Sequence, residues 1–90
     1  ALPADHALLF IHDRPGRYPY WMHNVRVPLD IIWMDRDHRI VEISEATPPC
    51  LAEASQCPSF GGNAESMFVL ELAAGQAARH ALKTADRIGF

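Results

Sequence analysis

Alternating apolar and polar positions divide the chain into short strand-like runs separated by turn-forming residues. The most informative run covers residues 20–35 and holds both tryptophans and the only Ile-Ile pair. Within it, residues 29–35 are apolar at both alternating sets of positions, which is typical of a central strand covered on both sides. In residues 20–24, Trp21 and His23 fall on one side of an extended chain, and Tyr20, Met22 and Asn24 fall on the other.

The rest of the pattern predicts a mainly β fold, a small β-sandwich or barrel-like domain with one short α-helix near the C-terminus. We expect residues 29–35 and 40–45 to form a hairpin across the polar turn between them. The other predicted elements are strands at 8–12 and 67–72, a turn at 13–16, a long loop at 46–66, a helix of about two turns within 73–83, and a terminal strand or frayed tail at 86–90. One domain, 1–90, accounts for the whole sequence.

Composition narrows the class of protein. Apolar residues make up 49% and charged residues 21%, as in folded soluble domains rather than disordered chains. The net charge is −3 and the eight lysines and arginines are scattered, which argues against a nucleic-acid partner. No apolar run is long enough to predict a membrane span, and residues 1–6 show no signal-peptide pattern.

Two cysteines, Cys50 and Cys57, lie in a proline-rich part of the long loop. We favour a disulfide, which would close a short loop and indicate a periplasmic or exported protein. The alternative is a pair of free thiols in a cytosolic loop. A zinc site is disfavoured because the chain has no spacing that supplies the two further ligands, so no metal and no cofactor are predicted.

Three polar residues stand in or beside apolar strands, namely Asn24, Asp30 and Glu71. A carboxylate in such a place is costly unless it is paired, hydrogen-bonded or faces a cleft. Asp30 follows a proline turn and could accept bonds from backbone donors. Glu71 could pair with Arg26 or face water, and a binding or catalytic role is the alternative for each residue.

Three functions remain open. The first is a non-enzymatic binding or interaction module for an unknown small ligand or peptide, with a candidate surface of Trp21, His23, Asn24, Asp30 and Glu71 and the cysteine loop as its rim. The second is a small hydrolase-like enzyme with Asp30 and Glu71 as acid and base, which requires both carboxylates in one concave site. The third is a purely structural domain whose polar residues hold turns in place.

Five stretches in order resemble domain-of-unknown-function family 192. Residues 20–35 resemble its Trp-Met-Lys-Asn … Pro-Leu-Asp-Ile motif, and residues 68–75 resemble its Val-Leu-Glu-Leu-x-Ala-Gly motif. The first strand, the two-cysteine loop and the closing Leu-Lys-x-Gly-Asp-x-Val segment also agree. The resemblance implies a compact, mostly β fold. It carries the family's polar positions onto Asn24, Asp30 and Glu71.

Three departures from the family pattern matter. His23 stands where lysine is usual, and Ala85 stands where glycine is usual, so Ala85 would be strained if that turn needs a positive φ. The family also begins with a further strand that this sequence lacks. A sheet without that strand would have an unpaired edge, so we expect self-association as a homodimer or higher oligomer.

Overall fold

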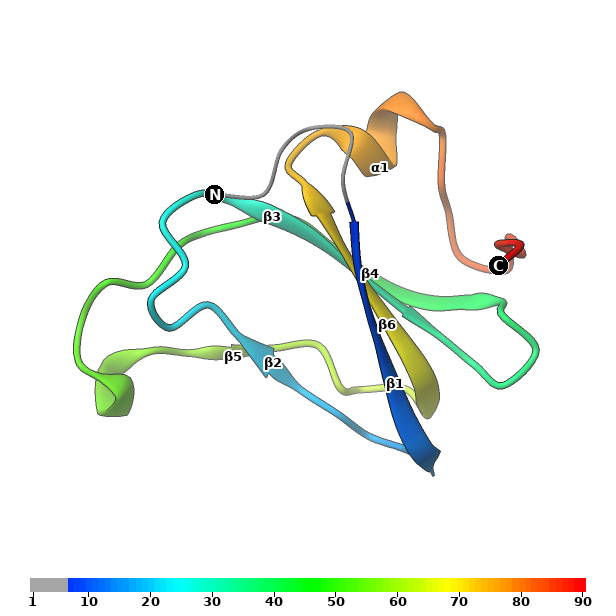
Figure 1. The fold of residues 1–90 in the computed structure, drawn as a ribbon, viewed down its shortest axis with the longest axis horizontal. Helices are drawn as coiled ribbons and strands as arrows, with labels where there is room; N and C mark the ends of the chain where they lie inside the picture. The colour runs from blue at the N-terminus through cyan, green and yellow to red at the C-terminus, as the bar shows by residue number, and fades with distance from the viewer. Residues whose placement is uncertain (1–6) are drawn as a thin grey trace.

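The computed structural model describes residues 7–90 and contains a four-stranded antiparallel sheet (Figure 1). Its strand order is β1-β6-β3-β4. The four strands are β1 (Ala7–Gly16), β3 (Leu29–Met34), β4 (Ile40–Thr47) and β6 (Ser66–Ala73). The expected hairpin of β3 and β4 is confirmed, and β3 is central, with β6 as its other neighbour. The prediction of a mainly β fold with one short helix near the C-terminus is therefore confirmed.

A separate ribbon of two strands, β2 (Tyr20–Trp21) and β5 (Ser59–Phe60), lies beside the sheet (Figure 1). β5 and a 3₁₀ turn, η1 (Ala54–Gln56), both lie within the segment that the sequence predicts as one long loop. The ribbon is antiparallel, with Tyr20 opposite Phe60 and Trp21 opposite Ser59. Its inward side chains supply the second layer of the domain.

The sheet has two covered faces, and each forms its own core. The ribbon face carries Leu29, Ile31, Trp33 and Val69, which pack against Met22 and the partly buried Tyr20 and Phe60 of the ribbon. The helix face carries Ile32, Met34 and Ile40, which pack against Ala77 of α1 (Gln76–Arg79). All six residues of β3 are buried because layers cover the strand on both faces, which explains its continuous apolar pattern.

The turn predicted at 13–16 is wrong. β1 continues through these residues to Gly16, which pairs with Ser66, although the register shifts between Ile11 and Gly16. The shift accommodates Pro15, which cannot donate a backbone hydrogen bond to the neighbouring strand. The Pro-Gly pair therefore marks an irregularity within a strand rather than the end of one.

The helix is one turn rather than the expected two. Ala73 still belongs to β6, and Gly75 adopts φ 92°, so the helix begins only at Gln76. Ala81, with φ 53°, lies just beyond its C-terminal end. The alanine and leucine spacing that predicts a longer helix reflects packing of single side chains, such as Ala77 and Leu82, onto the sheet.

The C-terminal segment runs beside the start of β4 without forming a strand. Arg87 makes an isolated bridge to Arg39, and the N–H of Ile40 donates to the carbonyl of Asp86 at 2.8 Å. Ala85 adopts φ 76°, so the turn does need a positive φ. An L-residue in that conformation costs about 1–2 kcal/mol, which is the strain expected from alanine at a glycine position.

No helix within residues 7–90 is long and apolar enough to cross a lipid bilayer. The absence of a signal-peptide pattern concerns residues 1–6, which lie outside the described residues.

Candidate functional site

Trp21 and His23 share one side of the chain, as alternation predicts, and in the structure that side points away from the sheet. Tyr20 and Met22 pack inward, and Met22 is fully buried. The indole of Trp21 is 48% exposed and its ring centroid lies 4.8 Å from that of the His23 ring. The two rings together form an outward aromatic surface, which we call the Trp21–His23 platform.

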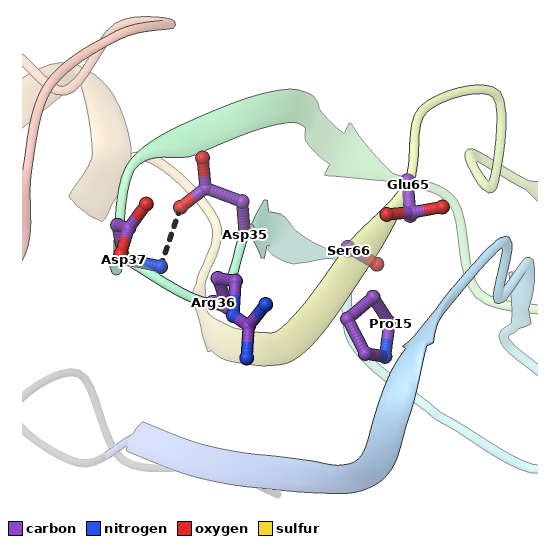
Figure 2. A pocket seen from close by; sticks show the side chains of 6 residues that line it. All are labelled: Pro15, Asp35, Arg36, Asp37, Glu65 and Ser66. Atoms are coloured by element: carbon purple, nitrogen blue, oxygen red, sulfur yellow. Dashed lines mark hydrogen bonds between the residues drawn. The ribbon is translucent and has the colours of Figure 1, made fainter.

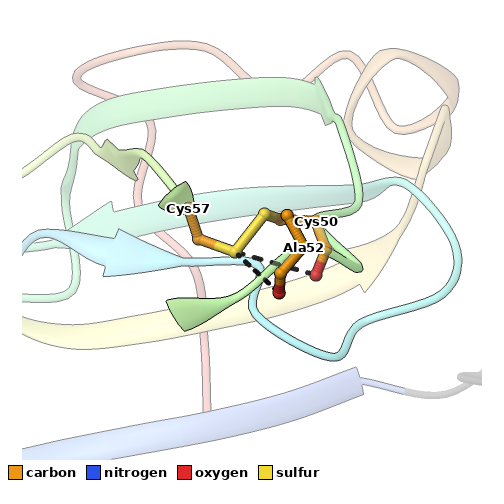
Figure 3. Close-up of a disulfide and its surroundings, with 3 residues drawn as sticks. All are labelled: Cys50, Ala52 and Cys57. Carbon is orange, nitrogen blue, oxygen red and sulfur yellow. Dashed lines mark hydrogen bonds between the residues drawn. A yellow bond between two sulfur atoms is a disulfide. The ribbon is translucent and has the colours of Figure 1, made fainter. Parts of the chain in front are cut away.

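A disulfide frames this platform. Cys50 and Cys57 are bonded, which confirms the expected pairing (Figure 3). Cys50 forms a parallel bridge with His23. The N–H of Asn24 donates to the carbonyl of Cys50 at 2.9 Å, and the N–H of Cys50 donates to the carbonyl of Met22 at 3.1 Å. Cys57 lies two residues before Ser59, which pairs with Trp21. The crosslink thus joins the two backbone segments that pair with the platform strand.

Sulfur–oxygen contacts accompany the disulfide. The Sγ of Cys57 lies 3.8 Å from the carbonyl of Cys50 and 4.0 Å from that of Ala52 (Figure 3). A disulfide sulfur carries no proton, so these are packing contacts rather than hydrogen bonds. Residues 51–56 are exposed throughout, and the loop is therefore held at its two ends rather than by burial.

Asn24 has a backbone reason to be at its position. It adopts φ 62° in the turn where the N–H of Val25 donates to Met22 at 3.1 Å. Asparagine tolerates this left-handed conformation better than other residues with a Cβ. Its side chain is exposed beside the platform, so the amide is available to solvent.

Asp30 is fully buried and acts as an acceptor for two backbone donors. Its Oδ1 accepts a bond from Ala46 N–H at 2.8 Å, and its Oδ2 accepts one from Ala77 N–H at 2.9 Å. Ala46 itself adopts φ 46° at the end of β4, and Ala77 lies in the first turn of α1. The side chain of Asp30 therefore joins β4 to α1, and the prediction that it accepts bonds from backbone donors is confirmed.

Glu71 is buried on the ribbon face, and no described residue gives its carboxylate a stabilising partner. It is 9% exposed and lies between Leu8 of β1 and Ile31 of β3 in the register of the sheet. Within residues 7–90 its carboxylate forms no hydrogen bond or ion pair, so neither the expected pairing with Arg26 nor a solvent-facing position is found. Burial raises the pKa of Glu71 above its ordinary value of 4.5.

The five predicted residues do not form one surface. Glu71 pairs with Ile31 and so faces the ribbon, whereas Asp30 pairs with Leu72 and faces α1. The two carboxylates lie on opposite faces of the sheet, so the hydrolase-like hypothesis that uses them as acid and base in one site is wrong. Trp21 and His23 do lie together, on the outer side of the ribbon, and Asn24 follows them in the adjoining turn.

Sequence reasoning missed an aromatic cluster on the ribbon face. The ring of His12 stacks on Tyr18 at 3.6 Å between centroids, and its Nε2 is 2.9 Å from the hydroxyl oxygen of Tyr20. Burial, and secondarily the charge of Glu71, raises the pKa of Tyr20 to about 12. The alternation places Tyr20 on the opposite side from Trp21, but only the structure shows that this side is inward and that β1 lies beside it.

A polar pocket of about 230 Å³ lies at the end of the sheet where the β3–β4 turn approaches β1 (Figure 2). Its walls include the exposed charged residues Arg36, Asp37 and Glu65. Ser66 at its base is fully buried, and its hydroxyl has no hydrogen-bond partner among the described residues. Across residues 7–90, no three acidic, histidine or cysteine side chains are close enough together to hold a metal ion.

A pH-dependent destabilisation is expected from Glu71. The Glu71 carboxyl keeps its proton to higher pH in the folded chain than in the unfolded chain. The contribution of Glu71 to stability therefore falls as pH rises above 4.5 and through the raised pKa of the folded state. Glu71→Gln should remove that loss and be more stable than wild type at pH 7, with no advantage at pH 4. Urea unfolding across this range measures the difference.

Glu53→Gln is the matched control for this series because Glu53 is exposed and makes no side-chain hydrogen bond within the described residues. Its stability should follow that of wild type at every pH. A Glu71→Gln variant that is equally or less stable at pH 7 would contradict the expected cost of the buried charge.

The fold and this site define a small β domain whose sheet is covered by a two-stranded ribbon on one face and a short helix on the other, with a disulfide-framed aromatic surface. The model of family DUF192, described as "Uncharacterized ACR", matches residues 1–90. The chain belongs to this family, which confirms the resemblance in the sequence.

Two solved structures are similar to the chain. One, a protein of unknown function from Novosphingobium aromaticivorans, has 27% identity and a TM-score of 0.86 over 100% of this chain and 61% of its own. The other, from Sinorhizobium meliloti and described as a candidate transcription regulator, has 30% identity and a TM-score of 0.81 over 97% of this chain and 64% of its own. The chain thus spans less than two thirds of either. No curated protein matches it.

Proposed function

We propose that the chain is a non-enzymatic binding module whose ligand lies against the Trp21–His23 platform. The exposure of the Trp21 indole carries this proposal. A large aromatic side chain gains more from burial than most residues, yet Trp21 is 48% exposed while Trp33 is fully buried. Leaving one of two tryptophans outward on a crosslinked frame is best explained by a surface that a ligand covers.

The neighbouring side chains favour a sugar ring as the ligand. Ser59, opposite Trp21 in the ribbon, and Asn24 are exposed and uncharged, and both can donate and accept hydrogen bonds. An indole face packs against the apolar C–H side of a sugar ring, while neutral polar groups bond its hydroxyls. Asp30 and Glu71 take no part in this surface, since they face the interior of the domain.

The disulfide supports a location in an oxidising compartment, the periplasm or the cell exterior. Disulfides form and persist there, whereas the reducing cytosol keeps most cysteines as thiols. A short crosslinked loop stabilises by about 2–3 kcal/mol in the chain-entropy model, which is a large share for a domain of this size. In such a compartment, envelope saccharides would be accessible ligands for the module.

Indole N–H signals in two-dimensional NMR test the proposal. The indole N–H of Trp33 is bonded to the Tyr18 carbonyl at 2.8 Å, whereas Trp21 is exposed, so the two signals should be distinguishable. We expect oligomers of N-acetylglucosamine or glucose at millimolar concentration to move the Trp21 signal and leave that of Trp33 in place. A tetrapeptide at the same concentration should move neither.

Variants separate a specific site from general aromatic adhesion. Trp21→Ala should abolish all saccharide-induced shifts in the backbone spectrum, while Phe90→Ala, which removes another exposed aromatic ring, should leave them intact. Absence of any shift with both saccharide series would reject the sugar proposal. A response to the peptide alone would reject it in favour of a peptide ligand.

A further inference from the structure

The outer strand β1 exposes four consecutive large apolar residues. Leu8 is 49% exposed, Leu9 and Phe10 are each 38% exposed, and Ile11 is 66% exposed. Successive residues of a strand point to opposite faces, so β1 presents apolar surface on both faces of the sheet. The other exposed large apolar residues of the described chain, Trp21, Leu51 and Phe90, do not form such a run.

β1 is also an open edge. It pairs only with β6, so its outer row of backbone N–H and C=O groups has no strand partner among the described residues. The segment 8–11 has no charged residue, proline or bulge that would discourage pairing. A long apolar edge of this kind is a template for another strand.

The opposite edge of the sheet is protected. β4 carries Glu42 and Glu45, and the Glu42 carboxylate accepts bonds from the backbone N–H and side-chain amide of Asn63 at 3.0 and 2.8 Å. The C-terminal segment covers the start of the same strand through the bridge between Arg39 and Arg87. Residues 8–11 of β1 have no protection of this kind, whereas the charged residues, Pro15 and the register shift of β1 all lie beyond Ile11.

We propose that β1 is a self-association surface, and that two copies of the chain pair antiparallel through it about a two-fold axis at Leu9. This interface is independent of the proposed ligand platform. The two four-stranded sheets then join as one continuous sheet. The ribbon faces of both copies lie on the same side, because the axis is perpendicular to the sheet.

The occupant is a second copy because the edge is complementary to itself. Because the axis is perpendicular to the sheet, each residue points to the same face in both copies. Paired residues share a face, so two paired residue numbers are both odd or both even. Pairing about Leu9 sets Leu8 opposite Phe10 and Ala7 opposite Ile11 of the second copy, so every pair within residues 7–11 is apolar. A slip to Phe10 would set Leu8 opposite His12 and Ala7 opposite the charged Asp13, which disfavours that register.

Sedimentation velocity of the 90-residue chain from micromolar to several hundred micromolar tests the surface. We expect a concentration-dependent dimer that Ile11→Lys weakens at least about tenfold, because lysine charges protect strand edges. Leu51→Lys is the matched control, since Leu51 is 65% exposed and Ile11 66%, but only Ile11 lies in β1. Circular dichroism confirms that each variant is folded.

A charge-swap pair tests the register. Leu9→Lys and Leu9→Glu each set two like charges opposite each other at the axis, so each should be monomeric alone. Mixing them should restore association as a heterodimer.

Three results would contradict the β1 interface, and a fourth would contradict its register. A chain that stays monomeric throughout, or a dimer that Ile11→Lys leaves intact, overturns the proposal. Loss of the dimer with Leu51→Lys would also overturn it by moving the contact to the cysteine loop. Failure of the Leu9 mixture to associate would overturn the register.

Discussion

Asp30→Asn is expected to destabilise the domain by about 2–4 kcal/mol, because a buried backbone donor that loses its acceptor costs about 1–3 kcal/mol and the new amide group adds a repulsive contact. Both carboxylate oxygens of Asp30 accept backbone bonds, from Ala46 and Ala77. An asparagine side chain keeps one acceptor oxygen for one of these two N–H groups. Its amide NH₂ would face the other backbone N–H, so that two donors would meet. Urea unfolding at pH 7 measures the loss.

Asp37→Asn is the control for this experiment, because Asp37 is exposed and its carboxylate makes no hydrogen bond within residues 7–90. It should change stability by less than about 0.5 kcal/mol, as surface substitutions usually do. If the two variants are equally stable, Asp30 does not hold β4 and α1 together. A loss confined to Asp30→Asn, with unchanged saccharide shifts at Trp21, would assign this residue a purely structural role.

The second large effect is expected at Gly61. This residue adopts φ 67°, and a Cβ added there would overlap the six-membered ring of the buried Trp33. Gly61→Ala therefore combines the backbone cost of a positive φ with overpacking of the ribbon face, for a total of about 2–5 kcal/mol. Trp33 cannot move aside easily, because its indole N–H is bonded to Tyr18.

Gly75→Ala separates the two contributions. Gly75 also has a positive φ, 92°, but a Cβ there would meet no atom within 4 Å. Its loss of stability should be about 1 kcal/mol, close to the backbone term alone. Thermal or urea unfolding of both variants compares them directly. Equal losses would show that Trp33 adjusts to the added methyl group.

Much of the sheet could be predicted from the sequence. The apolar pattern on both sides of residues 29–34 indicates a central strand, and β3 is central. The positions of Trp21 and Tyr20 on opposite sides of the chain follow from alternation alone, whereas the structure shows that the Trp21 side is the outer one. The comparison of Ala85 with the glycine usual in the family marks this turn as one where either strain or a rebuilt turn is expected, and the structure shows the strained alternative, with φ 76°.

The division of the candidate site could not be predicted in the same way. Alternation gives the relative sides of residues within one strand, but it does not say which sides of two strands share a face. Only the pairing of Ile31 with Glu71 and of Asp30 with Leu72 shows that the two carboxylates are separated. The pattern of single strands likewise gave no sign that His12, Tyr18 and Tyr20 would meet.

Residues that usually end a strand or favour a helix led to the other wrong predictions. The Pro-Gly pair at 15–16 indicates a turn by composition, yet the strand continues through a register shift because Gly16 still reaches Ser66. The alanine-rich segment after β6 indicates a helix, but Gly75 delays its start and Ala81 follows its end with a positive φ. Tertiary pairing overrode local preference in both places.

The exposed segment between Cys50 and Cys57 has an evolutionary consequence. Its ends are fixed by the crosslink, and its six intervening residues contribute nothing to either core. The entropic cost of closing a loop grows only slowly with the number of residues in it. Substitutions and insertions in this segment can therefore accumulate in related chains without selection against misfolding. The rim of the platform is the part of the domain where new ligand preferences can arise at least risk to the fold.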